Sequence, residues 1–349
     1  MGRRPVLLVF AVVVAACGGG SEPGGPDAPS VAIGTDTTVV AFEGEHVYFA
    51  GADNRRQASK EVTFPARAQR YSRVTLRLGL RCPSGGCDWW DRLAHLSLVV
   101  PGPGPNGEIE TELELARFIT PYRVGGQFTV DVTDFQRELE ATRVVRVFID
   151  TWVGPGHANG SGWLVDASFE FTGGMPVPDP VAVRPLWAPR RLVYGHPERI
   201  IDPVDTVQLP EGLSATRVRA LVTGHGQGNA ENCAEFCAKD HAITVDQTRT
   251  VQRLWRDDCA TTAVPNQQGT WRYARAGWCP GAMVTPWIVD AVGEAGTHTV
   301  AYSVQNYENT CRPDAASCGG CTLGTGCDYD GGAHTEPGWE FSAVLIELK

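Results

Sequence analysis

The segment Cys82–Arg92, which reads CPSGGCDWWDR, combines residue types that suit chemistry on a sugar. Two cysteines five positions apart can close a tight loop through a disulfide. Directly behind them come two indoles together with Asp88, Asp91 and Arg92. An acid/base group, flat apolar faces for pyranose rings and a forked donor for hydroxyls or a carboxylate are the groups that sugar chemistry uses. The plainer interpretation is a disulfide-closed turn that carries surface charges.

Two further carboxylates lie beside aromatic residues. Asp150 follows an apolar run in Phe148–Trp152 (FIDTW), and Glu235 is the centre of Cys233–Cys237 (CAEFC). If the two cysteines pair, the five-residue loop is closed at both ends and holds its central side chain in one direction. Each carboxylate alone would be read as a solvated group at a strand end. Their shared setting of aromatic neighbours and a nearby disulfide favours a functional role.

Other catalytic patterns are absent from the sequence. It contains no Gly-x-Ser-x-Gly, no His-Glu-x-x-His and no phosphate-binding glycine loop. The eight histidines are scattered without a His-x-His pair, so a copper or zinc site, including that of a copper monooxygenase, is unsupported. If the cysteines are paired, a thiol nucleophile is not expected either. We therefore expect neither a metal nor a cofactor.

The N-terminal residues have the features of a bacterial lipoprotein signal. Arg3 and Arg4 precede the apolar run Val6–Ala16, which is too short to span a bilayer, and Cys17 follows small residues. The pattern predicts a signal peptide over 1–17, acylation of Cys17 and a flexible tether over 18–30, although an ordinary secretory signal would share most of it. Glycine rather than aspartate at position 18 favours the outer membrane or cell surface of a Gram-negative bacterium.

Charge and cysteine content fit an exported protein. Loss of Arg3 and Arg4 with the signal leaves 28 basic against 40 acidic residues, a net charge of −12, which argues against nucleic acid or an anionic membrane surface as partner. We expect a monomer. Eleven cysteines less Cys17 leave ten, an even number that predicts disulfides. The local pairs are Cys82–Cys87, Cys233–Cys237 and Cys259–Cys279. Two more pairs, or a zinc knuckle, are open to Cys311, Cys318, Cys321 and Cys327.

The hydrophobic pattern is that of short strands. Apolar residues alternate with polar or small ones around Val74–Leu80, Val145–Ile149, Phe169–Phe171 and Val300–Val304. Phe341–Leu348 is a continuous apolar run, which is typical of a central strand. A short helix is expected at Thr133–Leu139, with Thr133 as its N-cap.

A run of prolines and glycines divides the chain. Residues 173–181 separate an N-terminal domain over 31–172 from a C-terminal domain over 182–349, which carries a cysteine-rich insertion at 311–327. Forty glycines and 24 prolines agree with many turns. We expect an all-β protein made of two antiparallel jelly-roll sandwiches packed side by side.

Long motifs in both halves resemble the bacterial peptide-N-glycosidase F family. They occur in the family's order and extend over roughly Glu61 to Val289, and the resemblance fades after the tether and in the insertion. The motifs are Cys82–Arg92 (CPSGGCDWWDR), Arg117–Tyr122 (RFITPY), Asp131–Phe135 (DVTDF), Asp150–Trp152 (DTW), Cys233–Cys237 (CAEFC) and Arg275–Gly281 (RAGWCPG).

The resemblance implies two eight-stranded jelly rolls with the active site at their interface. It also implies hydrolysis, without a metal, of the amide between an asparagine side chain and the innermost N-acetylglucosamine of an N-glycan, so that N-glycosylated peptides and proteins are the expected partners. The catalytic positions carried over from the family are Asp91, Glu235 and Asp150. The sugar-contacting positions are Asp88, Arg92, Trp152, Arg275 and Trp278.

Two departures from the family pattern concern the substrate. Asp150 stands where the family pattern has glutamate, and His225 stands in a shortened loop where tryptophan is expected. An alternative function is therefore a surface glycan-binding or interaction module of the same fold with little or no turnover. Retention of Asp91, Arg92 and Glu235 together favours the enzyme.

Overall fold

The computed structural model describes residues 32–102, 110–195, 202–226, 234–291, 293–307, 327–329, 332–334 and 337–349. The expected signal peptide over 1–17 with Cys17, the expected tether over 18–30 and nearly all of the expected insertion over 311–327 lie outside these residues. Residues 32–349 form one compact unit. No helix in the described ranges has the length and apolar character needed to cross a membrane.

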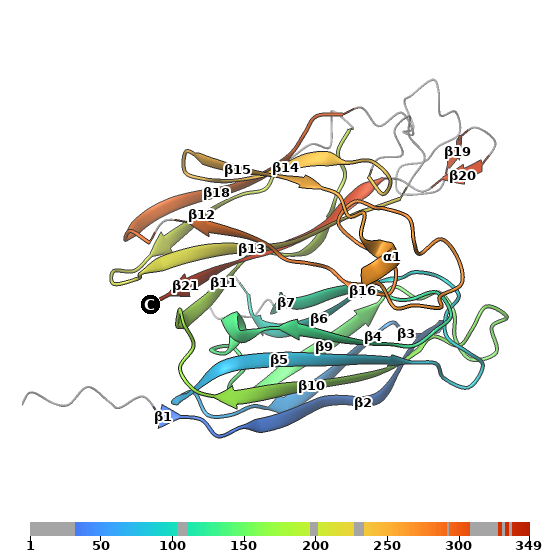
Figure 1. Ribbon diagram of the computed structural model, residues 1–349, viewed down its shortest axis with the longest axis horizontal. Coiled ribbons are helices and arrows are strands. Elements are labelled where there is room, and N and C mark those ends of the chain that lie inside the picture. The colour runs from blue at the N-terminus through green and yellow to red at the C-terminus, as the bar shows by residue number, and fades with distance from the viewer. Residues whose placement is uncertain are drawn as a thin grey trace, which may run out of the picture. The chain divides into compact units, whose positions relative to one another are not determined.

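Two sheets face each other in the first half of the chain (Figure 1). One has the order β1-β5-β10-β2-β3, with β8 beside β5. Its strands are β1 (Ala32–Ile33), β2 (Thr37–Ala50), β3 (Asp53–Arg55), β5 (Gln69–Arg81), β8 (Gly126–Asp131) and β10 (Trp163–Gly173). The other has the order β16-β7-β6-β9-β4. Its strands are β4 (Gln57–Thr63), β6 (Leu93–Pro101), β7 (Glu110–Ile119), β9 (Thr142–Ile149) and β16 (Ala282–Met283).

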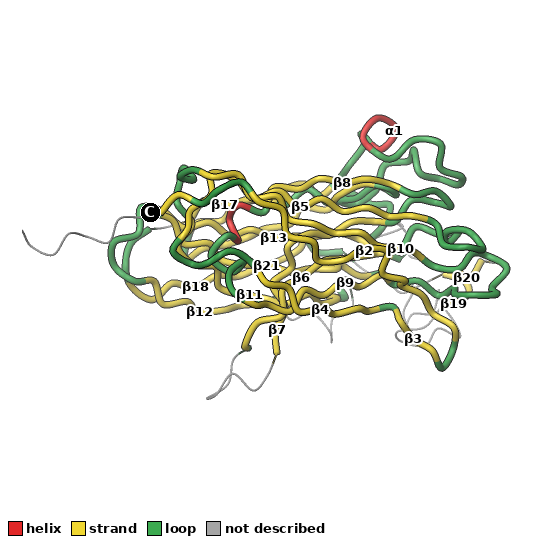
Figure 2. The backbone as a smooth tube through the Cα atoms, turned by 90° about the horizontal axis from the view of Figure 1, so that it is seen from below, coloured by secondary structure: helices red, strands yellow, loops and turns green. Residues whose placement is uncertain are grey.

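The second half forms another pair of sheets, each with four strands in the described residues. One has the order β11-β21-β13-β17, and its strands are β11 (Pro180–Leu192), β13 (Ala215–His225), β17 (Trp287–Ala291) and β21 (Gly338–Leu348). The other has the order β12-β18-β14-β15, and its strands are β12 (Val204–Leu209), β14 (Lys239–Val245), β15 (Thr248–Leu254) and β18 (Gly296–Val304). A separate hairpin joins β19 (Cys327–Tyr329) and β20 (Gly332–His334). Figure 2 shows strands through the body and loops gathered at its ends.

The expected all-β architecture of antiparallel sandwiches is confirmed. Alternating residues of the predicted strands, such as Leu76 and Leu78 of β5 and Tyr302 of β18, are buried in the cores. A single strand departs from the antiparallel pattern within the described sheets, because β1 runs parallel to β5. Strand β16 also joins the first sandwich although it comes from the second half, pairing with Ile119 and Phe118 of β7.

Strand β21 explains the continuous apolar run at Phe341–Leu348. It lies between β11 and β13, as expected of a central strand (Figure 1). Phe341 and Leu345 pack in the core of the second sandwich, whereas Val344 and Ile346 belong to the core cluster of the first. Since successive side chains of a strand point to opposite faces, both faces of β21 are covered by apolar contacts.

The helix expected at Thr133–Leu139 is wrong in its type, extent and cap. The structure has a single 3₁₀ turn, η1 (Thr133–Phe135), whose N-cap residue is Val132. The Thr133 hydroxyl accepts the backbone N–H of Val74 at 2.9 Å, so it is engaged with strand β5 and does not cap the turn. Phe135 and Leu139 are both buried, which shows that the apolar pair serves the core without a helix.

The boundary region and the disulfides complete the comparison. Strand β10 ends at Gly173 and β11 begins at Pro180, inside the stretch 173–181 that was expected as a linker. The disulfides Cys82–Cys87 and Cys259–Cys279 are present. Cys237 is also disulfide-bonded, and its expected partner Cys233 lies outside the described residues. The same is true of Cys311, Cys318 and Cys321 and of the side chain of Cys327.

Candidate active site

The loop that carries Asp91 joins β5 to β6 and is built around Asp88. The Asp88 carboxylate is buried and accepts hydrogen bonds from Arg92 Nε at 2.8 Å, from the Thr151 hydroxyl at 2.7 Å and from the Trp90 backbone N–H at 3.1 Å. The disulfide Cys82–Cys87 closes the loop immediately before it. Asp88 was expected to contact sugar. Its oxygens instead hold the loop together, so that Asp91 is presented from a fixed backbone.

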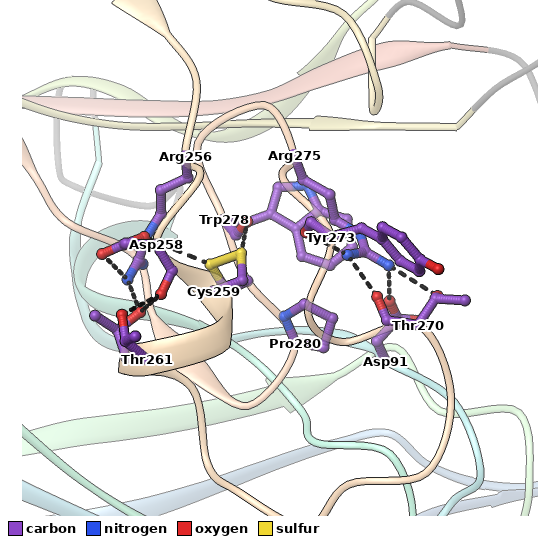
Figure 3. The surroundings of a disulfide bond; sticks show 12 residues. Asp91, Arg256, Asp258, Cys259, Thr261, Thr270, Tyr273, Arg275, Trp278 and Pro280 are labelled. Carbon is purple, nitrogen blue, oxygen red and sulfur yellow. Dashed lines mark hydrogen bonds and ion pairs between the residues drawn. A yellow bond between two sulfur atoms is a disulfide. The ribbon is translucent and has the colours of Figure 1, made fainter.

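Arg275 brings together the two main carboxylates expected from the sequence. Its Nη2 lies 3.8 Å from Asp91 Oδ2 and its Nε lies 3.4 Å from Glu235 Oε1. Figure 3 shows the contact between Arg275 and Asp91. The guanidinium is 1% exposed, against 16% for Asp91 and 18% for Glu235. Asp91 comes from the first half of the chain, whereas Glu235 and Arg275 come from the second. The site therefore forms only when both halves are folded.

The position of Arg275 is fixed by backbone and aromatic contacts. Its Nη1 donates to the Tyr273 carbonyl at 2.9 Å and to the Thr270 carbonyl at 3.1 Å. The guanidinium carbon also lies 4.8 Å from the centre of the Trp278 ring. The disulfide Cys259–Cys279 ties down the following backbone (Figure 3). Most donors of Arg275 are thus occupied by protein, and its charge serves the two carboxylates.

Burial shifts the protonation of both carboxylates in the same direction. It raises the pKa of Glu235 to about 7, and the negative charge of Asp91 adds to the rise while Arg275 opposes it. Burial also raises the pKa of Asp91, against a hydrogen bond from Tyr122 and the charge of Arg275. Because the two carboxyls lie on one guanidinium, their titrations are coupled. Near neutral pH Glu235 is therefore partly protonated, beside a second carboxyl whose pKa is also raised.

Tyr122 is a site residue that sequence reasoning did not assign. Burial and the charge of Asp91 raise the pKa of its phenol, so the hydroxyl keeps its proton and donates to Asp91. The same oxygen lies 3.3 Å from the Thr270 hydroxyl. Tyr122 ends the motif Arg117–Tyr122, and that membership in a long motif was its one signal in the sequence.

Asp150 lies at the end of β9, within the electrostatic reach of Arg92. Arg56 Nη1 donates to Asp150 Oδ1 at 3.1 Å, and nothing in the sequence pointed to Arg56. Partial burial raises the pKa of Asp150, whereas the charges of Arg56 and Arg92 lower it. Its side chain is 44% exposed. Asp150 is therefore accessible to a ligand, and it is held by an arginine other than the one that holds Asp91 and Glu235.

The aromatic residues expected to stack on sugar differ in exposure. Trp152 is 50% exposed, and the Arg56 guanidinium lies 4.3 Å from the centre of its ring. Trp278 is 2% exposed, its indole N–H donates to the Gly224 carbonyl at 2.6 Å, and the ring of His225 stacks on it at 5.0 Å. In this structure Trp278 has no face free for a sugar and instead supports Arg275, which is also buried. Among the residues expected to contact sugar, Trp152 is the one that presents an exposed aromatic surface.

Comparison with known proteins indicates the family of the chain. The chain matches the family model of the N-terminal part of peptide-N-glycosidase F over residues 36–161 and that of the C-terminal part over residues 198–318. It is 28% identical over 295 residues to the peptide-N(4)-(N-acetyl-beta-D-glucosaminyl)asparagine amidase F of Elizabethkingia miricola, covering 78% of this chain and 79% of that protein.

Solved structures agree on the fold. The structure of peptide-N-glycosidase F, described as a glycosylasparaginase from Flavobacterium meningosepticum, has a TM-score of 0.72 at 23% identity, with 90% of this chain and 96% of that chain covered. The structure of PNGF-II has a TM-score of 0.66 at 15% identity, with 90% of this chain and 65% of that chain covered. With both parts of the family model matched in order and the same two-sandwich fold, the chain belongs to the peptide-N-glycosidase F family.

Proposed function

We propose that this protein is a hydrolase that cleaves the amide bond between an asparagine side chain and the innermost N-acetylglucosamine of an N-glycan. The glycan leaves as a glycosylamine, and aspartate remains in the peptide. One observation carries the proposal: Asp91 and Glu235, from different halves of the chain, lie 3.8 Å and 3.4 Å from Nη2 and Nε of one buried guanidinium. The amidase name of the relative from Elizabethkingia miricola supports the same reaction.

The reaction requires that water attack the asparagine carbonyl carbon and that the leaving nitrogen gain a proton. We assign Asp91, in its ionised form, as the group that accepts the proton of the attacking water. Glu235, whose pKa is raised to about 7, is a reservoir for the proton that the nitrogen takes as the carbon–nitrogen bond breaks. The balance is one water consumed, one hydroxyl on carbon and one hydrogen on nitrogen.

The neighbouring residues would position these groups and the sugar. The hydrogen bond from Tyr122 and the charge of Arg275 oppose the rise that burial causes in the pKa of Asp91. Exposed Trp152 offers a face to the pyranose, and Asp150 lies two positions before it, where its carboxylate can accept from a sugar hydroxyl. In this proposal Asp91 and Glu235, which share Arg275, carry out the chemistry. Asp150 and Trp152 recognise the sugar.

The test is glycan release from a denatured N-glycoprotein by the purified protein. We expect free glycan and a gain of about 1 Da at the former glycosylated asparagine, together with one heavy oxygen in the new carboxylate when the reaction runs in H₂¹⁸O. Asp91→Asn, which keeps the shape and removes the charge, should lower kcat/KM about 10²–10⁴-fold. Asp290→Asn on β17, where the side chain is exposed, is the matched control, and its kcat/KM should equal that of the parent.

The outcome also decides between the enzyme and its alternative. A protein that binds glycopeptide with Trp152 but releases no glycan would be a surface glycan-binding module of the same fold. Release at the parental rate by Asp91→Asn would contradict the catalytic assignment itself.

We also propose that the protein is exported and held at the membrane by acylation of Cys17, on the outer membrane or cell surface of a Gram-negative bacterium, where it acts as a monomer on N-glycosylated proteins. The support is the apolar run Val6–Ala16 followed by small residues and Cys17.

A further inference from the structure

A second pocket opens at the edge of the second sandwich, between the edge strands β15 and β17. It has a volume of about 350 Å³, within the range of small-molecule sites, and Val222 and Leu254 lie in its wall. Two indoles, those of Trp255 and Trp287, line it. The Trp255 side chain is 37% exposed, an unusual position for an indole that serves only the core.

Two buried polar atoms in this pocket lack a hydrogen-bonding partner among the described residues. They are His241 Nε2 and Gln252 Oε1. His241 of β14 and Gln252 of β15 are directly opposite in the antiparallel register, so their side chains share one face, and their Cβ atoms are expected about 5 Å apart. His241 is 1% exposed, its Nε2 atom is buried, and the residue lines the pocket. A buried polar atom without a partner costs stability unless a ligand or water satisfies it.

The hydrogen-bonding roles of the two atoms follow from their neighbours. His241 Nδ1 lies 2.5 Å from the Tyr302 hydroxyl, which is fully buried and keeps its proton. Burial also lowers the pKa of His241 to about 3, so its ring is neutral. If the hydroxyl donates to Nδ1, the ring carries its own proton on Nε2 and presents a donor. Gln252 Oε1 is an acceptor. The floor of the pocket thus offers one donor beside one acceptor.

We propose that this pocket is a second carbohydrate site that binds an N-acetylhexosamine. The acetamido group has the complementary pair, a carbonyl oxygen for His241 Nε2–H and an N–H for Gln252 Oε1, and its methyl group would meet Leu254. The pyranose ring would then lie against Trp255. The choice of N-acetylhexosamine as ligand class rests on the proposed function, because such sugars form the core of the glycan that it releases.

The pocket is separate from the candidate active site but shares a wall with it. Arg256, which lines the pocket, exchanges two backbone hydrogen bonds with Arg275, at 2.8 and 3.0 Å. In the view of Figure 3, Arg256 with Asp258 and Arg275 with Asp91 lie on opposite sides of the disulfide Cys259–Cys279. Asp258 Oδ1 accepts from Arg256 Nε at 2.8 Å, so these two charges are already paired and are not the recognition groups.

Calorimetric titration of the full chain with N-acetylglucosamine and with N,N′-diacetylchitobiose tests the proposal. We expect two sites in the parent protein. Trp255→Ala should weaken one of them by about tenfold or more. Trp152→Ala should weaken the other. Gln252→Leu should remove the preference of the pocket for N-acetylglucosamine over glucose. Val251→Ala, at an exposed position on the opposite face of β15, is the matched control and should bind like the parent.

The outcomes separate this inference from the proposed function. A single site that is insensitive to Trp255→Ala overturns the inference, as does equal binding of glucose and N-acetylglucosamine, which would mean that water alone fills the floor of the pocket. Glycan release is measured separately with each folded variant, verified by circular dichroism. Sugar binding that depends on Trp255 without any release would reject the amidase proposal and retain the pocket. Glycan release without sugar binding that depends on Trp255 would reject the pocket and retain the amidase proposal.

Discussion

At the scale of single residues, Glu235 couples function to stability. Its pKa is about 7 in the folded protein against an ordinary value of 4.5, so between these pH values the folded state binds more protons than the unfolded state. The free energy of unfolding contributed by this group therefore falls as pH rises from 4.5 to 7 and is constant above. A carboxyl with this shift is a destabilising group at neutral pH.

Glu235→Gln removes the titrating group and should stabilise the protein in a pH-dependent way. The gain over the parent should be small near pH 4 and should rise through pH 7 to at most about 3.5 kcal/mol, from about 1.4 kcal/mol per pKa unit over a shift from 4.5 to about 7. Urea unfolding at several pH values measures this gain in the free energy of unfolding. Asp290→Asn is the control, and its difference from the parent should not change with pH. A gain that does not change with pH would contradict the role of burial at Glu235. The loss of activity should be smaller than for Asp91→Asn.

Asp150 permits a test in the opposite direction, by lengthening a side chain. Aspartate is shorter than glutamate by one carbon–carbon bond, about 1.5 Å, which a bridging water can fill. Arg56 already pairs with Asp150 at 3.1 Å and is positioned to keep a longer carboxylate oriented. We expect Asp150→Glu to raise kcat/KM on a glycopeptide and Asp150→Asn to lower it. A clear fall for Asp150→Glu would mean that the backbone has already adapted to the shorter residue.

The sequence motifs identified the candidate catalytic residues, but they did not predict the burial of the residues around them. Asp91, Glu235 and Arg275 were each singled out because they lie in motifs that indicate the family, and the structure brings the three together. The burial of Asp88 and Trp278 could not be predicted, because exposure depends on contacts such as Thr151 with Asp88 and His225 with Trp278. Such contacts join residues that are far apart in the sequence, so they cannot be predicted from local sequence patterns.

At the scale of elements, the loop Cys82–Arg92 illustrates how a short segment acquires rigidity. The disulfide Cys82–Cys87 closes one end of the loop, and the hydrogen bonds to Asp88 close the other. Replacing both cysteines by alanine should lower the free energy of unfolding by about 2 kcal/mol, the chain-entropy value for so short a loop. It should also lower kcat/KM, because Asp91 follows in the same loop.

Two measurements check this pair of effects. Thermal unfolding reports the stability, and glycopeptide kinetics report the placement of Asp91. A lower melting temperature with unchanged kcat/KM would show that the hydrogen bonds to Asp88 alone position the catalytic loop.

The positions of the longer strands could be predicted from the sequence, but the pairing between strands could not always be predicted. The period-two alternation predicted β5, β9, β10 and β18, since each buries every second residue. The pairing of the two-residue strand β16 with β7, and the parallel pairing of β1 with β5, left no such signal because so short a segment carries no period. The prediction of a helix was wrong because the Thr133 side chain forms a hydrogen bond with the backbone of β5 and does not cap a helix.

At the scale of the whole molecule, the two sandwiches are joined through buried charge as well as apolar contacts. Glu114 and Arg117 of β7 form an ion pair at 2.7 Å with almost no exposed surface. Arg117 also donates to the Glu340 carbonyl at 2.5 Å, and Ser342 donates to Glu114 at 2.5 Å. Because a buried pair is costly unless its remaining hydrogen bonds are satisfied, these contacts from β21 specify how the sandwiches meet. Nothing in the sequence indicated this role.

Anchoring also belongs to the whole molecule. If Cys17 is acylated, Cys17→Ser should move the protein from the membrane fraction to the soluble fraction, because the acyl chains supply the membrane affinity. Gly18→Asp should leave it membrane-bound but retain it at the inner membrane. Cell fractionation with immunodetection measures both. Membrane association of Cys17→Ser at the parental level would contradict acylation at this residue.

The place of β21 governs when a newly made chain becomes an enzyme. Because β21 lies between β11 and β13 and covers both cores, the second sandwich cannot close until the chain has been synthesised through Leu348. The Asp91 loop can take shape earlier, but Glu235 and Arg275 belong to the half that closes last. A chain cut short before Gly338 would therefore be inactive however well its first half folds. Catalytic competence thus requires the last strand of the described chain, although none of the site carboxylates belongs to it.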